Sequence, residues 1–354
     1  MRVILATDSF KGCLTSRQVE AALAAALQAR GIPTTSLPMS DGGDGMLRAF
    51  AQAMHGTLRH AYVHDPLMRP VKASYAVCAD GTAIIETAQA CGLSLMEAHE
   101  RNPLMASTYG VGEILLQAID HGSRHFIIGL GGSGTSDCGR GMLSALATRL
   151  TGGQMELLPS HPLIQSCQFT LASDVCNPLY GPQGAAHVYG RQKGATPVMQ
   201  EILDRQAQAF ALHSACVLGY DKSQSPGAGA AGGLGYAFMQ YLGAEVQSGA
   251  HMLLQSLRFP SLLHDTHLVI TGEGSADRQT LMGKLPVCIL QQVRQCSDIP
   301  VWLIAGCVSD ADALLQAGFQ HVESINPPGF PQSEAMKPEV AIAHLTRWVA
   351  HSFR

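Results

Sequence analysis

The sequence predicts a two-domain α/β protein in which a parallel-sheet domain is interrupted by a second α/β domain. A chain of 354 residues is longer than one hydrophobic core usually supports. Strand and helix patterns alternate at both ends of the chain, as they do in parallel sheets. Between these ends the patterns are mixed. We therefore expect residues 1–60 and 263–354 to form one discontinuous domain, and residues 61–262 to form the inserted domain.

The first sixty residues have a β-α-β-α pattern. Residues 2–6 (RVILA) form a short apolar run that is typical of a buried strand. A helix should begin near Ser16, its expected N-cap, and end before Gly31, because glycine commonly follows a helix end. A second strand over 34–39 and a helix over 46–54 follow.

The middle of the chain has a different pattern of apolar and polar residues. Three stretches from about residue 57 alternate as antiparallel strands do, with a turn signal at residues 79–81. Helices are expected over 110–121 and 197–218. The uncharged stretch 223–244 is long enough to cross a bilayer, but its glycine-rich first half offers little bulky apolar surface. It is predicted to be a buried loop that leads into a core helix.

Regular alternation returns near the C-terminus. The pattern predicts strands over 267–275, 301–306 and 321–325, and helices over 285–296, 309–317 and 338–351. With the two strands at the front of the chain, these make five parallel strands. Five parallel strands with helices are the number found in a flavodoxin-like domain.

Composition excludes several classes of function. The net charge is −4 and only 14% of residues are charged, without basic clusters, so neither nucleic acid nor a membrane surface is an expected partner. The ten cysteines include no CxxC pair, which favours buried thiols in a reducing cytosol over disulfides or zinc ligands. The apolar run at the N-terminus is too short for a signal peptide. A cytoplasmic protein with a small-molecule site is expected.

A glycine-rich loop follows the apolar residues 126–128. The stretch FIIGLGGSGTSDCGRG gives a strand, a loop and the start of a helix. Glycines let backbone N–H groups approach an anion, and a helix N-terminus carries a partial positive charge, so the loop suits a phosphate group. The candidate phosphate-binding residues of this loop are Gly131, Gly132, Ser133, Thr135 and Asp137.

Acidic and basic side chains follow three strands of the predicted parallel sheet. In such sheets, ligands bind at the carboxyl ends of the strands. Each acid taken alone is as readily a turn or capping residue, but their coincidence at three strand ends favours a shared site. Carboxylates suit Mg²⁺ beside phosphate oxygens, and Lys11, Lys193 and Lys284 could neutralise a transferring phosphoryl group. The strand-end candidates are Ser9, Lys11, Asp41, Asp44, Glu273 and Asp277.

Other motifs fail when their context is considered. Residues 129–134 match GxGxxG, but no convincing ribose-binding acid follows about 20 residues later, since Glu156 lies in a weakly patterned segment. Gly283-Lys284 resembles the end of a Walker A motif, yet Leu285 replaces its Ser/Thr. The spacing of His55, His60 and His64 is too loose for a helical metal pair, and there is no GxSxG elbow.

Eight motifs, in order along nearly the whole chain, resemble the bacterial glycerate kinases of the type-1 family. They are ATDSFKG (6–12), SDGGDG (40–45), PLMRPV (66–71), ERNPL with TYGVGE (100–113), GLGGSGTSD (129–137), SDVCNPLYGPQGAA with QKGAT (173–196), GAGAAGGLG (227–235) and TGEGSADRQTLMGK (271–284). The resemblance implies a kinase that uses ATP and Mg²⁺ to phosphorylate D-glycerate, usually to 2-phosphoglycerate. It also implies a flavodoxin-like domain with an inserted restriction-enzyme-like domain.

The sequence departs from the family pattern at a few positions. Asp44 stands where glutamate is usual, which keeps the carboxylate but shortens its reach. Ser275-Ala276 replaces a typical Arg-Leu, so a phosphate or carboxylate contact is lost that Arg278 or Arg140 could supply. The remaining departures are Ser40, Gly134, Ser136 and His251.

For such a reaction, we expect the acids to hold Mg²⁺ or to accept the hydroxyl proton. Asp277 is the favoured base, Asp41 a second catalytic acid, and Asp44 and Glu273 the favoured metal ligands. Lys11 and Lys284 would stabilise developing charge, and Ser9 would contact the nucleotide. The expected substrate contacts are Arg69, Arg101 and Lys193, because arginine matches a carboxylate bidentately.

Three points stay open from the sequence. A kinase of another small hydroxy or sugar acid and a non-catalytic metabolite sensor are the alternatives. The sequence does not distinguish phosphorylation at C2 from phosphorylation at C3. It also does not determine the oligomeric state.

Overall fold

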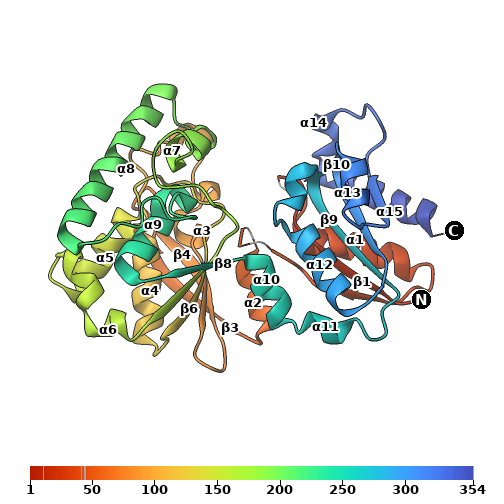
Figure 1. Cartoon of the computed structure of the whole chain (residues 1–354), viewed down its shortest axis with the longest axis horizontal. Coiled ribbons are helices and arrows are strands. Elements are labelled where there is room, and N and C mark those ends of the chain that lie inside the picture. Colours follow the sequence, from red (N-terminus) through yellow and green to blue (C-terminus); the bar gives the residue numbers. More distant parts are fainter. Residues whose placement is uncertain (11, 41, 44, 354) are drawn as a thin grey trace. The chain divides into compact units, whose positions relative to one another are not determined.

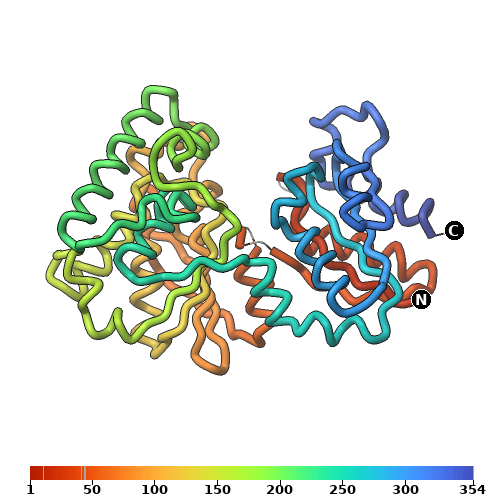
Figure 2. Tube along the Cα trace, viewed as in Figure 1, coloured from red at the N-terminus to blue at the C-terminus, as the bar shows by residue number. Residues whose placement is uncertain are grey.

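The computed structural model describes residues 1–10, 12–40, 42, 43 and 45–353. The chain forms two compact units. Unit 1 contains residues 1–41 and 250–354, and unit 2 contains residues 42–249. The colours of Figure 2 show that the two ends of the sequence, red and blue, build unit 1 together.

Unit 1 is built on a sheet of five parallel strands, as predicted. The sheet order is β2-β1-β9-β10-β11, which is the 2-1-3-4-5 order of flavodoxin-like folds. Strand β1 pairs with β2 on one side and with the central strand β9 on the other, so segments from the two ends of the chain lie side by side within the sheet (Figure 1). The strands are β1 (Val3–Thr7), β2 (Thr34–Ser36), β9 (Leu268–Ala276), β10 (Val301–Val308) and β11 (His321–Ser324).

Helices cover both faces of this sheet, which explains why its strands read as continuous apolar runs. Val3 and Leu5 of β1 pack with α1 (Ser16–Gln28) and α15 (Pro338–Ser352) in one core cluster. Helix α12 (Leu285–Cys296) contacts β1, β9 and β10. The other helical elements of this unit are α10 (Gly249–Ser256), α11 (Phe259–Leu262), η5 (Arg278–Leu281), α13 (Ala311–Gln316) and α14 (Gln332–Ala335).

The N-cap of α1 differs from the prediction by one residue. Thr15, not Ser16, is the cap, and it forms a capping box with Gln18. The hydroxyl of Ser16 instead donates a hydrogen bond to the Thr7 carbonyl (2.7 Å) and accepts one from the Met39 N–H (3.0 Å). Ser16 therefore ties the helix to the ends of two neighbouring chain segments.

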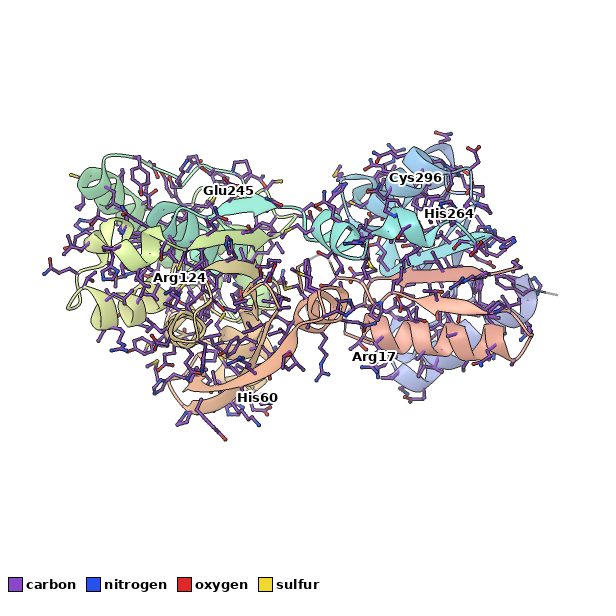
Figure 3. All side chains as sticks on the ribbon, turned by 90° about the horizontal axis from the view of Figure 1, so that it is seen from below. Arg17, His60, Arg124, Glu245, His264 and Cys296 are labelled. Carbon is purple, nitrogen blue, oxygen red and sulfur yellow. The ribbon has the colours of Figure 1, made fainter. Side chains whose placement is uncertain are left out.

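Unit 2 is built on a mixed sheet of six strands in sequence order. The pairs β3–β4 and β4–β5 are antiparallel, as predicted, and β5 to β8 run parallel. The pattern had not indicated β7 or β8. Strand β3 is an edge strand, and His60 lies on its exposed part (Figure 3). The strands are β3 (Thr57–His64), β4 (Pro70–Val77), β5 (Ala83–Glu86), β6 (His125–Gly129), β7 (Gln168–Ala172) and β8 (Glu245–Gln247).

The core of unit 2 joins the sheet to its longer helices. The rings of Phe126 and Phe169 stack at 4.9 Å between centroids, and Phe238 packs against Phe169 at 6.0 Å. The helices are α2 (Met46–Ala53), α3 (Ala88–Cys91), α4 (Tyr109–Asp120), α5 (Arg140–Leu150), α6 (Pro162–Gln165), α7 (Ala185–Tyr189), α8 (Pro197–Leu218) and α9 (Ala230–Leu242), with 3₁₀ turns η1 (Leu93–Leu95), η2 (Ala98–Glu100), η3 (Met155–Ser160) and η4 (Arg191–Lys193).

The uncharged stretch 223–244 forms a loop and the buried helix α9, as expected. Just after its first residue, α9 has three residues in the left-handed region, Ala231, Gly232 and Gly233. Within the part of the chain that the structure describes, no helix is both long and apolar enough to cross a bilayer.

The compact units divide the chain between residues 41 and 42 and between 249 and 250, in both cases earlier than the boundaries expected near 60 and 263. Helix α2 shows why the first division comes early. It packs on β4 and β5, and its Leu47 N–H donates to Glu86 Oε2 of β5 at 3.0 Å. A helix that follows β2 in the sequence is thus held by the sheet of unit 2.

Candidate functional site

In unit 1, the predicted acids Glu273 and Asp277 lie toward the carboxyl ends of β1 and β9, together with Asp8. These strands pair side by side, with Thr7 opposite Gly272. The N–H of Asp8 continues the ladder to the Gly272 carbonyl at 2.8 Å. Asp8 and Glu273 are therefore neighbours at one edge, and both are buried. Ser9, whose N–H donates to Asp8 Oδ1 at 2.7 Å, lies at the same edge.

Glu273 is held by two neighbours from the segment that follows β9. The Thr280 hydroxyl donates to Oε1 at 2.6 Å, and the Lys284 ammonium donates to Oε2 at 3.2 Å. Burial raises the pKa of the Glu273 carboxyl, although the Thr280 hydrogen bond and the Lys284 charge oppose the rise. The structure thus places Lys284 beside a buried carboxylate, which holds its ammonium at the sheet edge.

Asp277 lies at the end of β9 and is partly exposed. Its carboxylate caps the turn η5 by accepting the Gln279 N–H at 2.7 Å. Its own N–H donates to the Thr280 hydroxyl at 3.0 Å. Thr280 therefore links Asp277 to Glu273, so the two predicted acids belong to one hydrogen-bonded cluster. The predicted residues Lys11, Asp41 and Asp44 lie outside the described residues.

In unit 2, close contacts between backbones explain several glycines of the loop that follows β6. A Cβ on Gly131 would lie 2.3 Å from the Gly43 Cα, and the Gly131 N–H donates to the Gly42 carbonyl at 3.0 Å. Gly132 has a φ of +75°, a conformation that favours glycine. These glycines are needed for packing, whether or not a phosphate binds.

Lys193 holds this loop through hydrogen bonds from its ammonium. Its side chain is buried, and its ammonium donates to Ser133 Oγ at 3.0 Å and to the Thr135 carbonyl at 2.7 Å. Desolvation lowers the pKa of Lys193 to about 8. Lys193 was expected to contact substrate, but the structure gives its ammonium two partners within the protein.

Asp137 also has structural partners. Its carboxylate accepts the N–H groups of Gly139 and Gly141, each at 3.0 Å, and both the N–H and the hydroxyl of Thr108, at 2.9 and 2.8 Å. It therefore caps the N-terminus of α5 and joins it to the start of α4. An acid so placed does not suit the phosphate contact expected from the sequence.

Three polar atoms in or near the loop are buried without a partner among the described residues. They are Nε of Arg101, Oγ of Ser136 and Oγ1 of Thr135. The Arg101 backbone lies against the lysine segment, since a Cβ on Gly194 would come within 2.5 Å of the Arg101 carbonyl oxygen. Buried polar groups without partners are costly, so these atoms suit a partner beyond the described residues.

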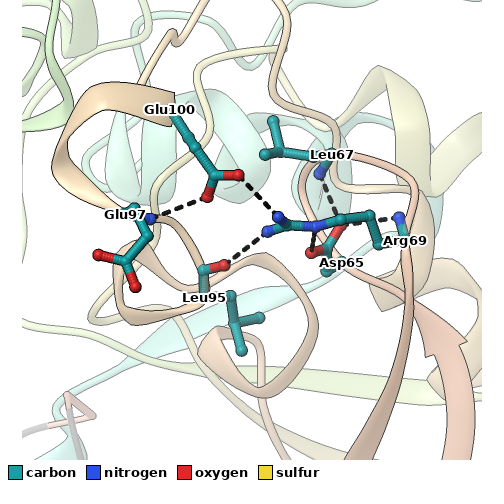
Figure 4. Close-up of polar contacts among 6 residues, drawn as sticks. All are labelled: Asp65, Leu67, Arg69, Leu95, Glu97 and Glu100. Atoms are coloured by element: carbon teal, nitrogen blue, oxygen red, sulfur yellow. Dashed lines mark hydrogen bonds and ion pairs between the residues drawn. The ribbon is translucent and has the colours of Figure 1, made fainter.

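Arg69 makes several hydrogen bonds within the protein (Figure 4). Its guanidinium donates to Asp65 Oδ2 at 2.7 Å, to Glu100 Oε1 at 2.8 Å and to the Leu95 carbonyl at 2.9 Å. These bonds tie the turn before β4 to the segment around η2. Of the two arginines expected to bind the substrate carboxylate, Arg101 is the better placed.

A cavity of about 510 Å³ borders the loop within unit 2. Its lining includes Ser136, Asp137 and Arg140, together with apolar side chains such as Met105. Its volume lies in the range of small-molecule pockets. The Arg140 guanidinium lies over the ring of Phe210, 5.6 Å from its centroid. By contrast, Arg278 pairs with Asp310 at 3.4 Å.

Comparison with known proteins identifies the family. Residues 3–354 match the sequence model of the glycerate kinase family. The chain belongs to this family. It is 38% identical over 357 residues to the glycerate kinase of Bacillus subtilis (strain 168), covering 95% of this chain and 93% of the relative. It is 36% identical over 344 residues to the glycerate 2-kinase of Escherichia coli (strain K12), with coverages of 92% and 90%.

A solved structure supports the fold of this family member. The chain is similar to the crystal structure of a protein assigned as glycerate kinase 2 from Salmonella typhimurium LT2, with a TM-score of 0.76 and 33% identity. The similarity covers 99% of this chain and 98% of that chain. The predicted α/β fold and the predicted family are confirmed.

Thr280 is the site residue that sequence reasoning missed. The spacing of Asp277 and Thr280 is a capping-box spacing, so the sequence carried a signal for their mutual hydrogen bonds. The sequence carried no such signal for the hydrogen bond from Thr280 to Glu273, because this bond depends on how η5 folds back on β9.

Proposed function

We propose that this protein transfers the γ-phosphoryl group of ATP to the C2 hydroxyl of D-glycerate, giving 2-phosphoglycerate and ADP. The observation that carries the proposal is the buried Glu273, which holds the Lys284 ammonium at the carboxyl edge of the unit 1 sheet. In open parallel sheets this edge is where ligands bind. The relatives named glycerate kinase and glycerate 2-kinase supply the substrate class.

In unit 1, we assign charge stabilisation to Lys284 and proton acceptance to Asp277. The hydroxyl oxygen bonds to the γ-phosphorus, the bond from that phosphorus to the ADP oxygen breaks, and the hydroxyl proton passes to the Asp277 carboxylate. The Asp277 carboxylate accepts the Gln279 N–H, and this hydrogen bond orients the carboxylate at the end of β9. The position of the Lys284 ammonium beside Glu273 supports its role, because a cation next to a transferring phosphoryl group offsets its charge.

In unit 2, we assign anion binding to the segment around Ser136. The Arg101 Nε and the Ser136 hydroxyl are buried donors without a described partner, and a carboxylate or phosphate oxygen would satisfy them. Arg140 lines the same cavity as Ser136 and provides a second guanidinium for an anion there. Lys193 holds the loop in shape through Ser133 and Thr135.

Mg²⁺ belongs to the proposal as the ion that accompanies ATP. Within the described ranges, no three His, Cys, Asp or Glu side chains come together as a metal cluster. Mg²⁺ needs only one or two carboxylates when phosphate oxygens supply other ligands. Glu273 suits this role less well than the sequence indicated, since both of its oxygens already accept hydrogen bonds. The bound ion would neutralise phosphate charge.

The test measures ADP release from magnesium-ATP with D-glycerate, with the smaller hydroxy acid tartronate and with longer hydroxy or sugar acids. We expect the highest kcat/KM with D-glycerate, and loss of turnover in Lys284→Met. Phosphorus and carbon NMR of the product should show phosphate at C2. Preference for a longer acid would replace the substrate assignment, phosphate at C3 would overturn the regiochemistry, and no turnover with any acid would favour a sensor.

A further inference from the structure

The first turns of helix α1 contribute two polar side chains to the sheet of unit 1. Ser16 and Glu20 are four residues apart, so they lie on the same side of the helix, and both are buried. The Ser16 hydroxyl donates to the Thr7 carbonyl at 2.7 Å, and Glu20 Oε1 accepts the Thr7 N–H at 3.2 Å. Both backbone groups of Thr7, the last residue of β1, are thus bonded to side chains of a helix.

The backbone ladder between β1 and β2 ends just before Thr7. At its start, the Val3 N–H donates to the Pro33 carbonyl at 3.0 Å. At its end, the Leu37 N–H donates to the Leu5 carbonyl at 2.8 Å. The hydrogen bonds of a parallel ladder are evenly spaced, with each strand contributing every second residue. The same series would therefore reach Thr7 at its next step.

The two side chains of α1 replace that next step. A regular ladder would join the Thr7 N–H to the Leu37 carbonyl, and the Met39 N–H to the Thr7 carbonyl. In the structure, Glu20 is the acceptor of the Thr7 N–H. The Ser16 hydroxyl accepts the Met39 N–H at 3.0 Å and donates to the Thr7 carbonyl, so it lies between that donor and that acceptor. The inserted hydroxyl keeps the segment after β1 apart from the segment after β2.

The separated segments lead directly into the candidate site of unit 1. Thr7 is followed by Asp8, which is buried at the carboxyl edge of the sheet, and by Ser9, whose N–H donates to the Asp8 carboxylate. Met39 is followed by Ser40, which is also buried. The places of these residues therefore depend on the spacing that the side chains of α1 impose.

Glu20 suits its position as a neutral acid. Its Oε2 is buried without a hydrogen-bond partner among the described residues, and its one printed contact is the Thr7 N–H. Burial raises the pKa of the Glu20 carboxyl well above its ordinary value, although the hydrogen bond from Thr7 opposes the rise. A buried carboxylate without a cation beside it is costly. Glutamine, which is uncharged and keeps an acceptor oxygen, should therefore replace Glu20.

We propose that Ser16 and Glu20 are positioning residues, which act through Thr7 to set the spacing of the two chain segments at the unit 1 site. The inference rests on the proposed function, because it takes the carboxyl edge of this sheet as the place of phosphoryl transfer. Neither side chain needs to touch a substrate. Their loss should lower kcat and leave the KM for D-glycerate nearly unchanged, since the contacts assigned to the acid lie in unit 2.

The first experiment measures steady-state kinetics with magnesium-ATP and D-glycerate, with rates referred to the folded fraction found by circular dichroism. Glu20→Met has a similar length but no oxygen acceptor, and it should lower kcat by about tenfold or more while the KM for D-glycerate changes less than about twofold. Glu20→Gln should stay within about threefold of the wild-type kcat. Wild-type kcat in Glu20→Met, or an equal loss in Glu20→Gln, would overturn the proposal.

Leu23→Ala is the control for a merely structural effect. Leu23 is a buried apolar residue of the same helix and packs in the core of unit 1. Its truncation should lower the stability of the protein and leave the kcat of the folded fraction unchanged. If Leu23→Ala lost as much kcat as Glu20→Met, the loss would be a general consequence of a weakened helix, and the positioning role would be refuted.

The second experiment tests whether the two side chains act through the same residue. Ser16→Ala removes the inserted hydroxyl and should also lower kcat. Because Ser16 and Glu20 bond to the two backbone groups of Thr7, Ser16→Ala/Glu20→Met should lose less kcat than the product of the two single losses. Wild-type kcat in Ser16→Ala, or a simple product in the double variant, would contradict the shared action.

Lys284→Met separates this inference from the proposed function. Loss of turnover in both Lys284→Met and Glu20→Met would support the two together. Loss in Lys284→Met with full turnover in Glu20→Met would overturn the positioning role alone. Full turnover in Lys284→Met would instead overturn the site in unit 1, and the positioning role with it.

Discussion

Replacing Lys193 with methionine tests the buried ammonium that braces the glycine-rich loop. The pKa of Lys193 is lowered from 10.5 to about 8 by desolvation. Between these two values the unfolded chain binds more protons than the folded protein, so folding stability should rise with pH. Below pH 8 both states are charged, and the folded state carries the full cost of burying the charge.

The expected magnitude follows from the same shift. Raising the pH from about 7 to 9 should stabilise the wild type relative to Lys193→Met by about tenfold in the unfolding equilibrium constant. Both proteins also contain buried thiols, such as those of Cys91 and Cys138, whose pKa values are raised to about 12. These thiols make the folding stability fall as the pH rises. Their effect is the same in both proteins, so it cancels when the variant is compared with the wild type.

The assay is urea unfolding of both proteins at the two pH values. The two tryptophans, Trp302 and Trp348, both lie in unit 1, so far-UV circular dichroism must follow the transition of unit 2. The variant should also lose kcat/KM by at least tenfold, because Ser133 and Thr135 lose their common donor. Equal pH dependence in the two proteins would refute the reasoning.

Three further predictions concern the site. Asp277→Asn should lower kcat more than tenfold, and a smaller loss, below about 1.4 kcal/mol, would exclude Asp277 as the base. Thr280→Val should destabilise unit 1 by about 1–3 kcal/mol. Because the Thr280 hydroxyl lowers the Glu273 pKa, Thr280→Val should also move the acidic limb of the pH profile of kcat/KM to higher pH. Thr280→Ser should restore both the stability and the pH profile. Arg101→Met should raise the KM for the acid at least tenfold and leave the KM for ATP unchanged. Arg69→Met should instead lower the Tm and leave kcat unchanged. The reverse pattern in the two variants would contradict both assignments.

The sheet of unit 1 could be predicted because its strands are buried on both faces. Residues 3–6 and 268–270 are apolar runs, and the structure forms β1 and β9 over them. Strand β8 could not be found in this way, because it has three residues with two of them exposed. Helix α2 was recognised from its pattern, but its attachment depends on Glu86, which is distant in the sequence.

The candidate site was only partly predictable because the same residue types serve structure and chemistry. Asp137 stands in a glycine-rich loop, as a phosphate site would suggest, yet it caps a helix. The sequence alone does not distinguish the roles of Arg69 and Arg101. Only the fold shows that Arg69 has three acceptors while Arg101 Nε has none among the described residues.

The position of β1 in the sheet has a consequence for biosynthesis. Leu5 pairs with Ile270, which follows it by 265 residues, and its other neighbour β2 has only three residues. At ordinary elongation rates, roughly 10–50 s pass before β9 has been synthesised. During this time all of unit 2 is made, while the apolar strand β1 lacks the partner that covers its second edge. Strand β1 is therefore the part of the ribosome-bound chain that is most exposed to chaperones and to misassembly.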